Sequence, residues 1–302
     1  MTAMANDVRE GYLLAPGGWI WFRAVGTHHR STPLLVLHGG PGAGHRYLEA
    51  LEALAADRCV VFYDQLGCGY SEAPQDRELW RIEYFVAELQ ALRELLGLER
   101  VHLYGHSWGG WLALEAMLTH PDGVTSLVLA STSAGLPEYT REIERLREEL
   151  PPDIYADMLE YERAGNHQSP EYKAALLEFY QRHLCRLSAW PQLLIDNVRN
   201  ITGNPVYETM QGPNEFVITG NLRTWDRTDR LGSIGVPTLI TVGRYDEATP
   251  ACAATLRQGI AGAQLRIFEQ SAHMPHIEEP EQYLATLKLF LADVDRRHIA
   301  AA

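Results

Sequence analysis

The sequence is poor in cysteine and lacks long apolar segments. Only four cysteines occur in 302 residues, and no two form a C-x-x-C pair, so the sequence predicts neither a zinc site nor a disulfide framework. No segment approaches the roughly 18 consecutive apolar residues that a membrane-spanning helix requires. The N-terminal segment MTAMANDVREG carries acidic residues and lacks the basic start and apolar stretch of an export signal. We therefore expect a cytoplasmic protein that is neither exported nor embedded in a membrane.

Basic residues are scarce relative to acidic ones. The chain has 26 Lys plus Arg against 39 Asp plus Glu, which gives a formal net charge of -13 at pH 7. Phosphate backbones and anionic lipid repel such a chain, so nucleic acid and membrane surfaces are disfavoured as partners. Hydrophobic residues make up 46% and charged residues 22%. This composition is ordinary for a globular protein and excludes a disordered chain.

Short apolar segments alternate with longer amphipathic ones along much of the chain. This alternation is typical of a parallel sheet whose strands are joined by helices. Between two of the strand-like segments, at residues 84–96, apolar residues recur at helical spacing, and Gly97 is placed to end that helix. Eight segments have the pattern of strands, and the first two form a hairpin: 11–15, 19–25, 34–37, 59–63, 101–104, 126–130, 238–242 and 265–268.

The alternation stops after Thr132 and resumes near Gly235. The residues between these points have mainly helical periodicity. We interpret residues 136–230 as a helical cap that is inserted into an α/β core made by residues 1–135 and 231–302. The segment 281–294 predicts a final amphipathic helix.

A serine near the middle of the chain has the setting of a catalytic nucleophile. Gly105-His106-Ser107-Trp108-Gly109 follows the predicted strand 101–104 and precedes a helix-like segment. It matches the G-x-S-x-G motif in its strand-turn-helix context, where the glycines allow a strained turn that lifts the Ser107 hydroxyl clear of the sheet. The alternative is a serine in an ordinary tight turn, which the agreement of the pattern on both sides disfavours.

A serine nucleophile needs a base, and the base needs an acid that orients it. In this arrangement the chain order is serine, acid, histidine. Asp246 and His273 each follow a predicted strand at its carboxyl end, where an α/β sheet gathers its functional groups. His276 is the competing base. Asp64 is the competing acid, but it precedes the serine and breaks the order, and its other interpretation is a carboxylate that holds a loop.

The attack of a serine on a carbonyl creates an oxyanion, which needs main-chain N–H donors. Trp108, directly after the serine, would supply one donor. Gly39 or Gly40, in the glycine-rich segment that follows the strand 34–37, would supply the second. A glycine-rich turn is also compatible with a phosphate site, but neither the Walker pattern nor a G-x-G-x-x-G spacing is present.

Taken together, these segments resemble the proline iminopeptidase (prolyl aminopeptidase) family of α/β-hydrolases over nearly the whole chain. The resemblance implies an α/β-hydrolase fold: an eight-stranded, mostly parallel sheet with an inserted helical cap. It also implies that Glu215 and Glu247 bind the free α-amine of the substrate. The segments that carry it are HGGPG at 38–42, DQLGCGYS at 64–71, GHSWGG at 105–110, GPNEF at 212–216, GRYDE at 243–247 and the pair Ala272-His273.

The same resemblance implies a serine aminopeptidase with Ser107, Asp246 and His273 as its triad. Such an enzyme hydrolyses the amide bond after an N-terminal proline or another small residue through an aminoacyl-enzyme, without a metal or organic cofactor. Its substrate would be a small peptide, an amino acid amide or an aminoacylated small molecule. Alternatives are an amino acid amidase, a hydrolase that deprotects an aminoacylated biosynthetic intermediate, a general esterase or acyltransferase, and a hydrolase-fold ligand receptor without enzymatic activity. The sequence does not predict an oligomeric state.

An ammonium group that leaves water must meet opposite charge, and neighbouring carboxylates raise each other's pKa. We therefore expect at least one raised pKa in the pair Glu215 and Glu247 when no ligand is bound. The alternatives are a solvated cap carboxylate for Glu215 and a surface neighbour of Asp246 for Glu247. Four aromatic residues would either line an apolar pocket beside this site or fill the cap's own core: Trp190, Tyr207, Phe216 and Trp225.

Overall fold

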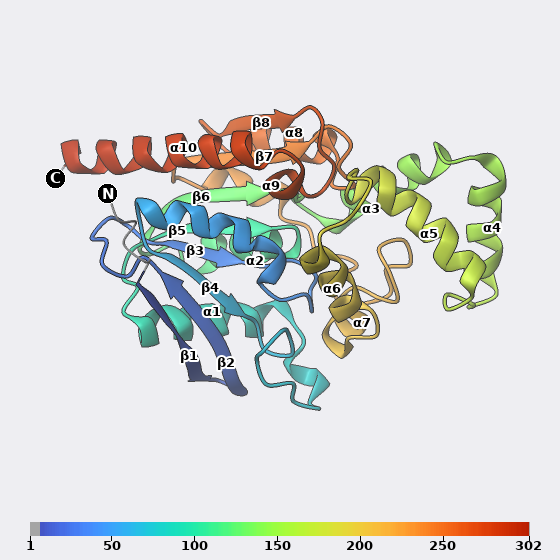
Figure 1. Ribbon diagram of the computed structural model, residues 1–302, viewed down its shortest axis with the longest axis horizontal. Coiled ribbons are helices and arrows are strands. Elements are labelled where there is room, and N and C mark those ends of the chain that lie inside the picture. The colour runs from blue at the N-terminus through green and yellow to red at the C-terminus, as the bar shows by residue number, and fades with distance from the viewer. Residues whose placement is uncertain (1–6, 302) are drawn as a thin grey trace.

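Eight strands form one sheet in the computed structural model, which describes residues 7–301 (Figure 1). The strand order is β1-β2-β4-β3-β5-β6-β7-β8. β1 and β2 are antiparallel, as are β2 and β4, and all later neighbours are parallel. The predicted eight-stranded, mostly parallel sheet is therefore confirmed. The strands are β1 (Val8–Ala15), β2 (Gly18–Val25), β3 (Leu34–Leu37), β4 (Val60–Asp64), β5 (Val101–His106), β6 (Val124–Ala130), β7 (Thr238–Gly243) and β8 (Gln264–Phe268).

The predicted segments find all eight strands but underestimate the length of several elements. β1 begins at Val8 because that residue still pairs with Val25. β5 continues to His106 because its last two residues pair with β6. The final helix, α10 (Pro280–Ala301), runs beyond the predicted end at residue 294. Strand pairing has no local signature in the sequence, so the ends of β1 and β5 were not predictable from it.

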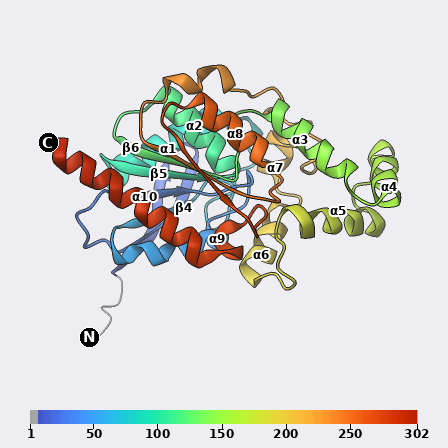
Figure 2. The same ribbon diagram turned by 90° about the horizontal axis from the view of Figure 1, so that it is seen from above.

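Helices cover both faces of the sheet (Figure 2). On one face, α1 (Ile82–Leu96), α2 (Trp108–Thr119) and α8 (Pro250–Gly259) share a core with Leu35 and Leu37. On the other face, the 3-10 helix η1 (Arg46–Ala56) and α10 share a core with Leu34 and Val36. Successive residues of β3 thus enter opposite cores, as the alternation of side chains along a strand requires.

Helix α1 ends where the sequence predicts. Gly97 adopts the left-handed conformation, with φ 67°, and its N–H donates to the carbonyls of Arg93 and Glu94. Glycine reaches this conformation without a steric cost, so the predicted C-cap is confirmed. Upstream, Phe85, Leu89 and other apolar residues at helical spacing are buried against the sheet.

Five helices lie between β6 and β7, in the segment predicted to be the cap (residues 136–230, here called the cap segment). They gather at the end of the molecule opposite the C-terminus (Figures 1 and 2). The division into a core of 1–135 and 231–302 and a cap of 136–230 stays a prediction. The helices are α3 (Leu136–Glu148), α4 (Pro152–Arg163), α5 (Pro170–His183), α6 (Gln192–Ile201) and α7 (Pro205–Met210), and the remaining elements are η2 (Arg77–Leu79), η3 (Thr228–Ser233) and α9 (Pro275–Glu278).

The cap segment has only a small core of its own. Leu146, Met158 and Phe179 belong to a separate apolar cluster made by α3, α4 and α5. In contrast, Leu194 of α6 and Met210 of α7 pack into the two large cores beside the sheet. The cap segment is therefore attached to the sheet by buried side chains at its near side.

Two expectations about location concern a membrane-spanning helix and an export signal at the N-terminus. Within this part of the chain, none of the helices combines the length and the apolar content needed to cross a bilayer. The first six residues, which belong to the N-terminal segment considered above, lie outside the described residues.

Truncation of a buried residue on α1 should destabilise the protein. Leu89 is 1% exposed, so Leu89→Ala should lower the free energy of unfolding by about 2–5 kcal/mol through lost burial and a new cavity. Leu95, on the same helix, is 50% exposed, and Leu95→Ala should change it by less than about 0.5 kcal/mol. Urea unfolding followed by circular dichroism measures both values. Equal losses in the two variants would contradict this account of α1.

Candidate active site

Ser107 occupies a strained turn between β5 and α2. Its backbone has φ 55° and ψ -122°, a conformation that non-glycine residues rarely adopt. The flanking glycines make this turn possible. A Cβ on Gly105 would lie 2.2 Å from the carbonyl oxygen of Gly109, and a Cβ on Gly109 would lie 2.2 Å from that of Leu37. The turn therefore excludes any side chain at either glycine.

His273 and Asp246 come together from two loops at the carboxyl ends of β7 and β8. The Nδ1 of His273 lies 2.7 Å from Oδ1 of Asp246, and both side chains are buried. Asp246 also accepts a hydrogen bond from the N–H of Ala248 at 2.8 Å. Burial lowers the pKa of His273, but the charges of Asp246 and Glu247 outweigh it and raise that pKa to about 9.

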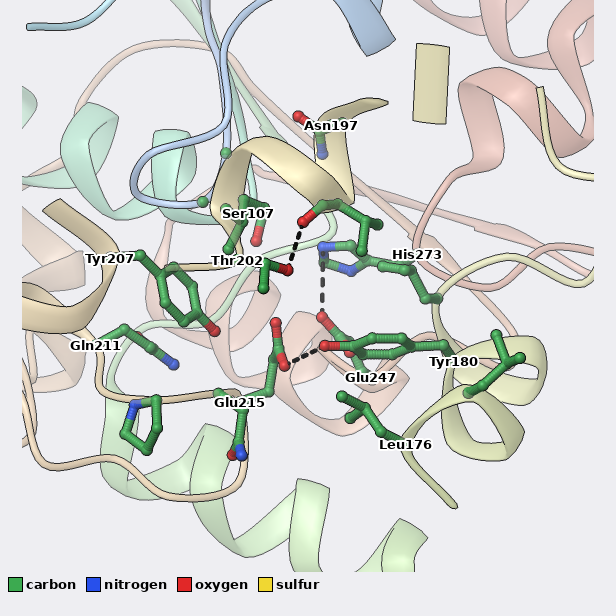
Figure 3. Close-up of a pocket in the computed structure, with 18 of the residues that line it drawn as sticks. Ser107, Leu176, Tyr180, Asn197, Thr202, Tyr207, Gln211, Glu215, Glu247 and His273 are labelled. Atoms are coloured by element: carbon green, nitrogen blue, oxygen red, sulfur yellow. Dashed lines mark hydrogen bonds and ion pairs between the residues drawn. The ribbon is translucent and has the colours of Figure 1, made fainter. Parts of the chain in front are cut away.

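Ser107 and His273 face one cavity of about 490 Å³. The cavity also exposes Gly40, Glu215 and Glu247, so residues that are far apart in the sequence share one space. Figure 3 shows Ser107 and His273 on one side of it, with Tyr180 and Leu176 of α5 on another. No hydrogen bond joins the Ser107 hydroxyl to His273 within residues 7–301, an arrangement that is common in active sites without substrate.

A chain of hydrogen bonds connects the glycine-rich loop to the nucleophile turn. The N–H of Gly39 donates to Tyr47 Oη at 2.8 Å, and that oxygen lies 2.8 Å from Nδ1 of His106. The Nε2 of His106 lies 3.0 Å from the carbonyl oxygen of His273. Because a carbonyl oxygen only accepts, this geometry assigns the proton to Nε2 of His106 and makes Nδ1 the acceptor of the Tyr47 hydroxyl.

This chain of bonds bears on the choice between the two predicted loop donors, Gly39 and Gly40. The N–H of Gly39 already donates to Tyr47, which favours Gly40 as the second oxyanion donor. Within the described residues, the N–H of Gly40 donates to no protein acceptor. Trp108 is the first residue of α2, so its N–H has no acceptor inside the helix. The N–H groups of Gly40 and Trp108 are thus the main-chain donors left beside Ser107.

Glu247 is buried, with an exposed fraction of 4%. Its Oε1 lies 3.4 Å from the hydroxyl of Tyr139 and 3.7 Å from Nε2 of His273, whereas its Oε2 is buried without a partner in the described chain. Burial raises the pKa of Glu247, the positive charge of His273 opposes this rise, and the negative charges of Glu215 and Asp246 add to it. This agrees with the expected raised pKa in the glutamate pair and excludes a surface position for Glu247.

Glu215 enters the cavity from the cap segment. Its Oε2 accepts a hydrogen bond from the hydroxyl of Tyr180 at 2.5 Å (Figure 3). Tyr207 and Gln211 line the same part of the cavity, and each has a buried oxygen without a hydrogen-bond partner among the described residues. Glu215 is therefore surrounded by polar groups and lies inside the cavity, so the alternative of a solvated cap carboxylate does not describe it.

A buried polar chain holds the loop that carries Glu215. Asn214 accepts hydrogen bonds from the N–H groups of Phe216 and Val217, both at 2.9 Å, and donates to the Tyr172 hydroxyl at 2.8 Å. That hydroxyl donates to Glu162, which is paired with Arg147 through two hydrogen bonds of 2.8 and 2.9 Å. The loop is thus fixed to helices α3, α4 and α5.

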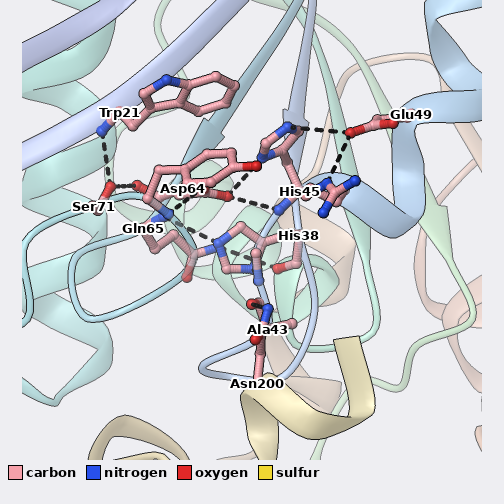
Figure 4. A network of polar contacts seen from close by, with 12 residues as sticks. Trp21, His38, Ala43, His45, Glu49, Asp64, Gln65, Ser71 and Asn200 are labelled. Carbon is pink, nitrogen blue, oxygen red and sulfur yellow. Dashed lines mark hydrogen bonds and ion pairs between the residues drawn. The ribbon is translucent and has the colours of Figure 1, made fainter. Parts of the chain in front are cut away.

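The competing base and acid have other contacts. Nε2 of His276 lies 3.1 Å from the carbonyl oxygen of Tyr47, and burial lowers the pKa of His276 to about 3, so the ring is neutral. Asp64 accepts hydrogen bonds from both the N–H and the ring of His45 and from the N–H of Tyr70 (Figure 4). All three donors belong to loops at the strand ends, so Asp64 has the contacts of a carboxylate that holds loops.

Three of the four aromatic residues considered above fit one of the two alternatives, and Trp225 fits neither. Trp190 and Tyr207 line the cavity. Phe216 packs against Phe179 in the cap segment, with ring centroids 4.8 Å apart. Trp225 is buried beside the sheet, where its ring N–H donates to Glu115 at 3.0 Å.

Comparisons with known proteins agree with this geometry. The model of the alpha/beta hydrolase fold family matches residues 32–280. A proline iminopeptidase from Heyndrickxia coagulans is 40% identical over 285 residues, which are 94% of this chain and 99% of that protein. One from Saccharolobus solfataricus is 38% identical over 296 residues, which are 97% of this chain and 96% of that protein. The chain belongs to the proline iminopeptidase family of α/β-hydrolases.

Solved structures extend the similarity to three dimensions. The crystal structure of a proline iminopeptidase from Mycobacterium smegmatis has a TM-score of 0.87 and 35% identity, and the match covers 97% of this chain and 100% of that one. The crystal structure of a protein named VinJ has a TM-score of 0.91 and 37% identity, with 95% and 99% covered. The family resemblance in the sequence is therefore confirmed.

Sequence reasoning missed several residues of this member of the family. Tyr47, Tyr139 and Tyr180 contact predicted site residues, but each lies in a helix whose pattern indicates only a buried face. The position of His106 inside G-x-S-x-G was the one local signal, because a polar side chain there lies beside the nucleophile. Tyrosine in a helix is normally part of the core, and nothing in the chain order reveals that its hydroxyl meets a carboxylate.

Removal of the Tyr47 hydroxyl should destabilise the protein. In Tyr47→Phe the Gly39 N–H and Nδ1 of His106 both lose a buried partner, at a cost of about 1–3 kcal/mol for each group left unpaired. Tyr12 is 55% exposed, so Tyr12→Phe is a matched control with little expected effect. Guanidinium unfolding reports both. An unchanged midpoint for Tyr47→Phe would show that these bonds do not stabilise the loops.

Proposed function

We propose that this protein is a serine aminopeptidase of the proline iminopeptidase type. It hydrolyses the amide bond that follows an N-terminal residue with a free α-amine, proline or another small residue. The observation that carries the proposal is the shared cavity of Ser107, His273, Glu215 and Glu247. Two carboxylates beside a nucleophile form a site for an ammonium group, because opposite charge compensates for the loss of its hydration. The proline iminopeptidases at about 40% identity support the same activity.

In the proposed mechanism, the substrate's ammonium binds between Glu215 and Glu247, and its first carbonyl carbon lies next to Ser107. His273 takes the proton of the Ser107 hydroxyl as the oxygen attacks that carbon. Asp246, 2.7 Å from Nδ1, orients the ring and stabilises the imidazolium. The N–H groups of Gly40 and Trp108 bind the oxyanion.

Collapse of this intermediate breaks the amide bond. The leaving amine takes the proton from His273, and the aminoacyl group remains on Ser107. A water molecule then gives a proton to His273 and attacks the ester carbon. As the ester bond breaks, His273 returns this proton to the Ser107 oxygen, which frees the amino acid and restores the Ser107 hydroxyl. No step draws on a metal or an organic cofactor.

Both proposed domains contribute residues to the site. The core, residues 1–135 and 231–302, supplies the triad, the oxyanion donors and Glu247. The cap, residues 136–230, supplies Glu215 and closes the cavity. We propose small peptides, amino acid amides or aminoacylated small molecules as substrates. We also propose a cytoplasmic location, which the small number of cysteines and the lack of a C-x-x-C pair support.

Replacement of the nucleophile tests the triad. Ser107→Ala should lower kcat/KM for prolyl 2-naphthylamide by at least about 1000-fold, because the triad acts as a unit. Ser131 is a buried serine that follows β6 and has a positive φ of 50°, so Ser131→Ala is a matched control that should keep most activity. Fluorescence of the released naphthylamine measures both. Activity retained in Ser107→Ala would exclude Ser107 as the nucleophile.

The amine site predicts a strong dependence on positive charge. Aminoacyl 2-naphthylamides with a free amine should be cleaved at least about 100-fold faster than their N-acetyl forms, and Glu215→Gln should reduce that ratio mainly by slowing the free-amine substrate. Glu208 also lines the cavity but is exposed, and Glu208→Gln should leave the ratio unchanged. Equal rates for free and acetylated substrates would make the amine site wrong and would favour an esterase-like activity.

A further inference from the structure

His273 faces a carboxylate at both ring nitrogens. Its Nδ1 lies 2.7 Å from Asp246, and its Nε2 lies 3.7 Å from Oε1 of Glu247 (Figure 3). A ring with a carboxylate at hydrogen-bond distance from one nitrogen and a second carboxylate at ion-pair distance from the other fits the imidazolium form, which carries a proton on both nitrogens. A general base, however, must have Nε2 free of a proton before it can take one from the serine. The contact with Glu247 therefore opposes the role of His273 as a general base, because it favours a proton on Nε2.

Among the described residues, the carboxylate of Glu247 has one side-chain partner other than His273. Its Oε1 also accepts a long hydrogen bond of 3.4 Å from Tyr139, and its Oε2 is buried with no partner within residues 7–301. A buried carboxylate with an unsatisfied oxygen is costly unless a donor fills the gap. An ammonium between Glu215 and Glu247 would fill it and would compete with His273 for the charge of Glu247.

The ionisable groups around Glu247 and His273 are either negatively charged or neutral. Glu215 and Asp246 act on His273 as anions and raise its pKa. His106 packs against His273, and His276 packs against His106; both rings are neutral because burial lowers the pKa of each. Burial and the nearby glutamates raise the pKa of the tyrosines of α3, α5 and α7, so they stay protonated: Tyr139, Tyr180 and Tyr207. His273 is thus the group in this cluster that can carry a compensating positive charge.

We propose that Glu247 holds a proton on Nε2 of His273 while the amine site is empty, and that the substrate's ammonium releases the base by taking over Glu247. The proposal rests on the proposed function, since it gives the amine site a second role. The proton from Nε2 passes to solvent, so one cation replaces another and the net charge of the buried cluster does not change. The neutral Nε2 can then accept the Ser107 proton.

This coupling makes the substrate's amine a condition for catalysis as well as for binding. A neutral acyl ester that enters the cavity leaves Glu247 paired with His273, and the base stays protonated near neutral pH. The acid limb of kcat/KM, which reports the free enzyme, should therefore lie at higher pH than the acid limb of kcat for a free-amine substrate, which reports the complex.

The decisive test is Glu247→Gln with p-nitrophenyl butyrate, an ester without an amine. This change should move the acid limb of kcat/KM down by about one pH unit or more, so that ester hydrolysis at neutral pH rises about tenfold. Hydrolysis of prolyl 2-naphthylamide should fall in the same variant. A gain with one substrate and a loss with the other cannot come from partial unfolding. An acid limb that stays in place or moves up would overturn the proposal.

Glu215→Gln is the matched control, because it removes the same charge but Glu215 does not contact His273. It should move the acid limb of ester hydrolysis by less than Glu247→Gln does. Equal shifts would assign the effect to overall charge and not to the 3.7 Å contact, and would overturn the proposal.

Proton release provides a second readout that does not need turnover. Binding of prolinamide to Ser107→Ala, measured by calorimetry at neutral pH in buffers of different ionisation enthalpy, should release up to about one proton per site. The double variant Ser107→Ala/His273→Gln should release much less, because it lacks the ring that gives up the proton, whereas undiminished release would identify Glu247 as the source and overturn the proposal. Binding of prolinamide without proton release would overturn the proposal. Failure of the wild-type enzyme to cleave free-amine substrates would instead contradict the proposed function, which the ester and pH experiments do not depend on.

Discussion

The close packing of β3, β5 and α2 around Ser107 is the constraint on which the site depends. A Cβ at Gly105 or Gly109 would lie 2.2 Å from a neighbouring carbonyl oxygen, which is too close for carbon and oxygen atoms that are not bonded to each other. With glycine at both positions, the chain leaves β5, turns through a positive φ at Ser107 and enters α2 with the Trp108 N–H free. The same packing brings the β3 loop, with Gly40, to the other side of the serine. A strained residue persists here because the surrounding sheet determines its conformation completely.

The second determinant is the amount of negative charge that the site buries. Asp246 and Glu247 are both buried, Glu215 lies in the same cavity, and His273 contacts the first two. Carboxylates out of water raise each other's pKa and need a cation or a proton. In our proposal, that requirement explains the selection of an amine and also controls the protonation of the base. Recognition and catalysis then use the same charge.

The cap segment combines a small core with firm attachment to the sheet. Its outer helices pack around Met158 and Phe179, whereas α6 and α7 enter the main cores. The chain of bonds from Arg147 through Glu162 and Tyr172 to Asn214 keeps the Glu215 loop in place. The proposed amine site therefore lies across the boundary between the two proposed domains, so the position of the cap segment determines the geometry of the pair Glu215 and Glu247.

The sequence by itself determined the eight strands, the α1 helix with its Gly97 cap, the strand-turn-helix at Ser107 and the chain order of Asp246 and His273. These features have local signatures: periodicity, glycine spacing and the position of a polar residue after an apolar strand. Only the tertiary structure decided that Tyr47 occupies the Gly39 N–H, that Trp225 belongs to the core and Trp190 to the cavity, and that Glu247 contacts Nε2 of His273. Each of these contacts joins side chains that are far apart in the sequence. Their distance in space is set by tertiary packing, and no local sequence pattern specifies it.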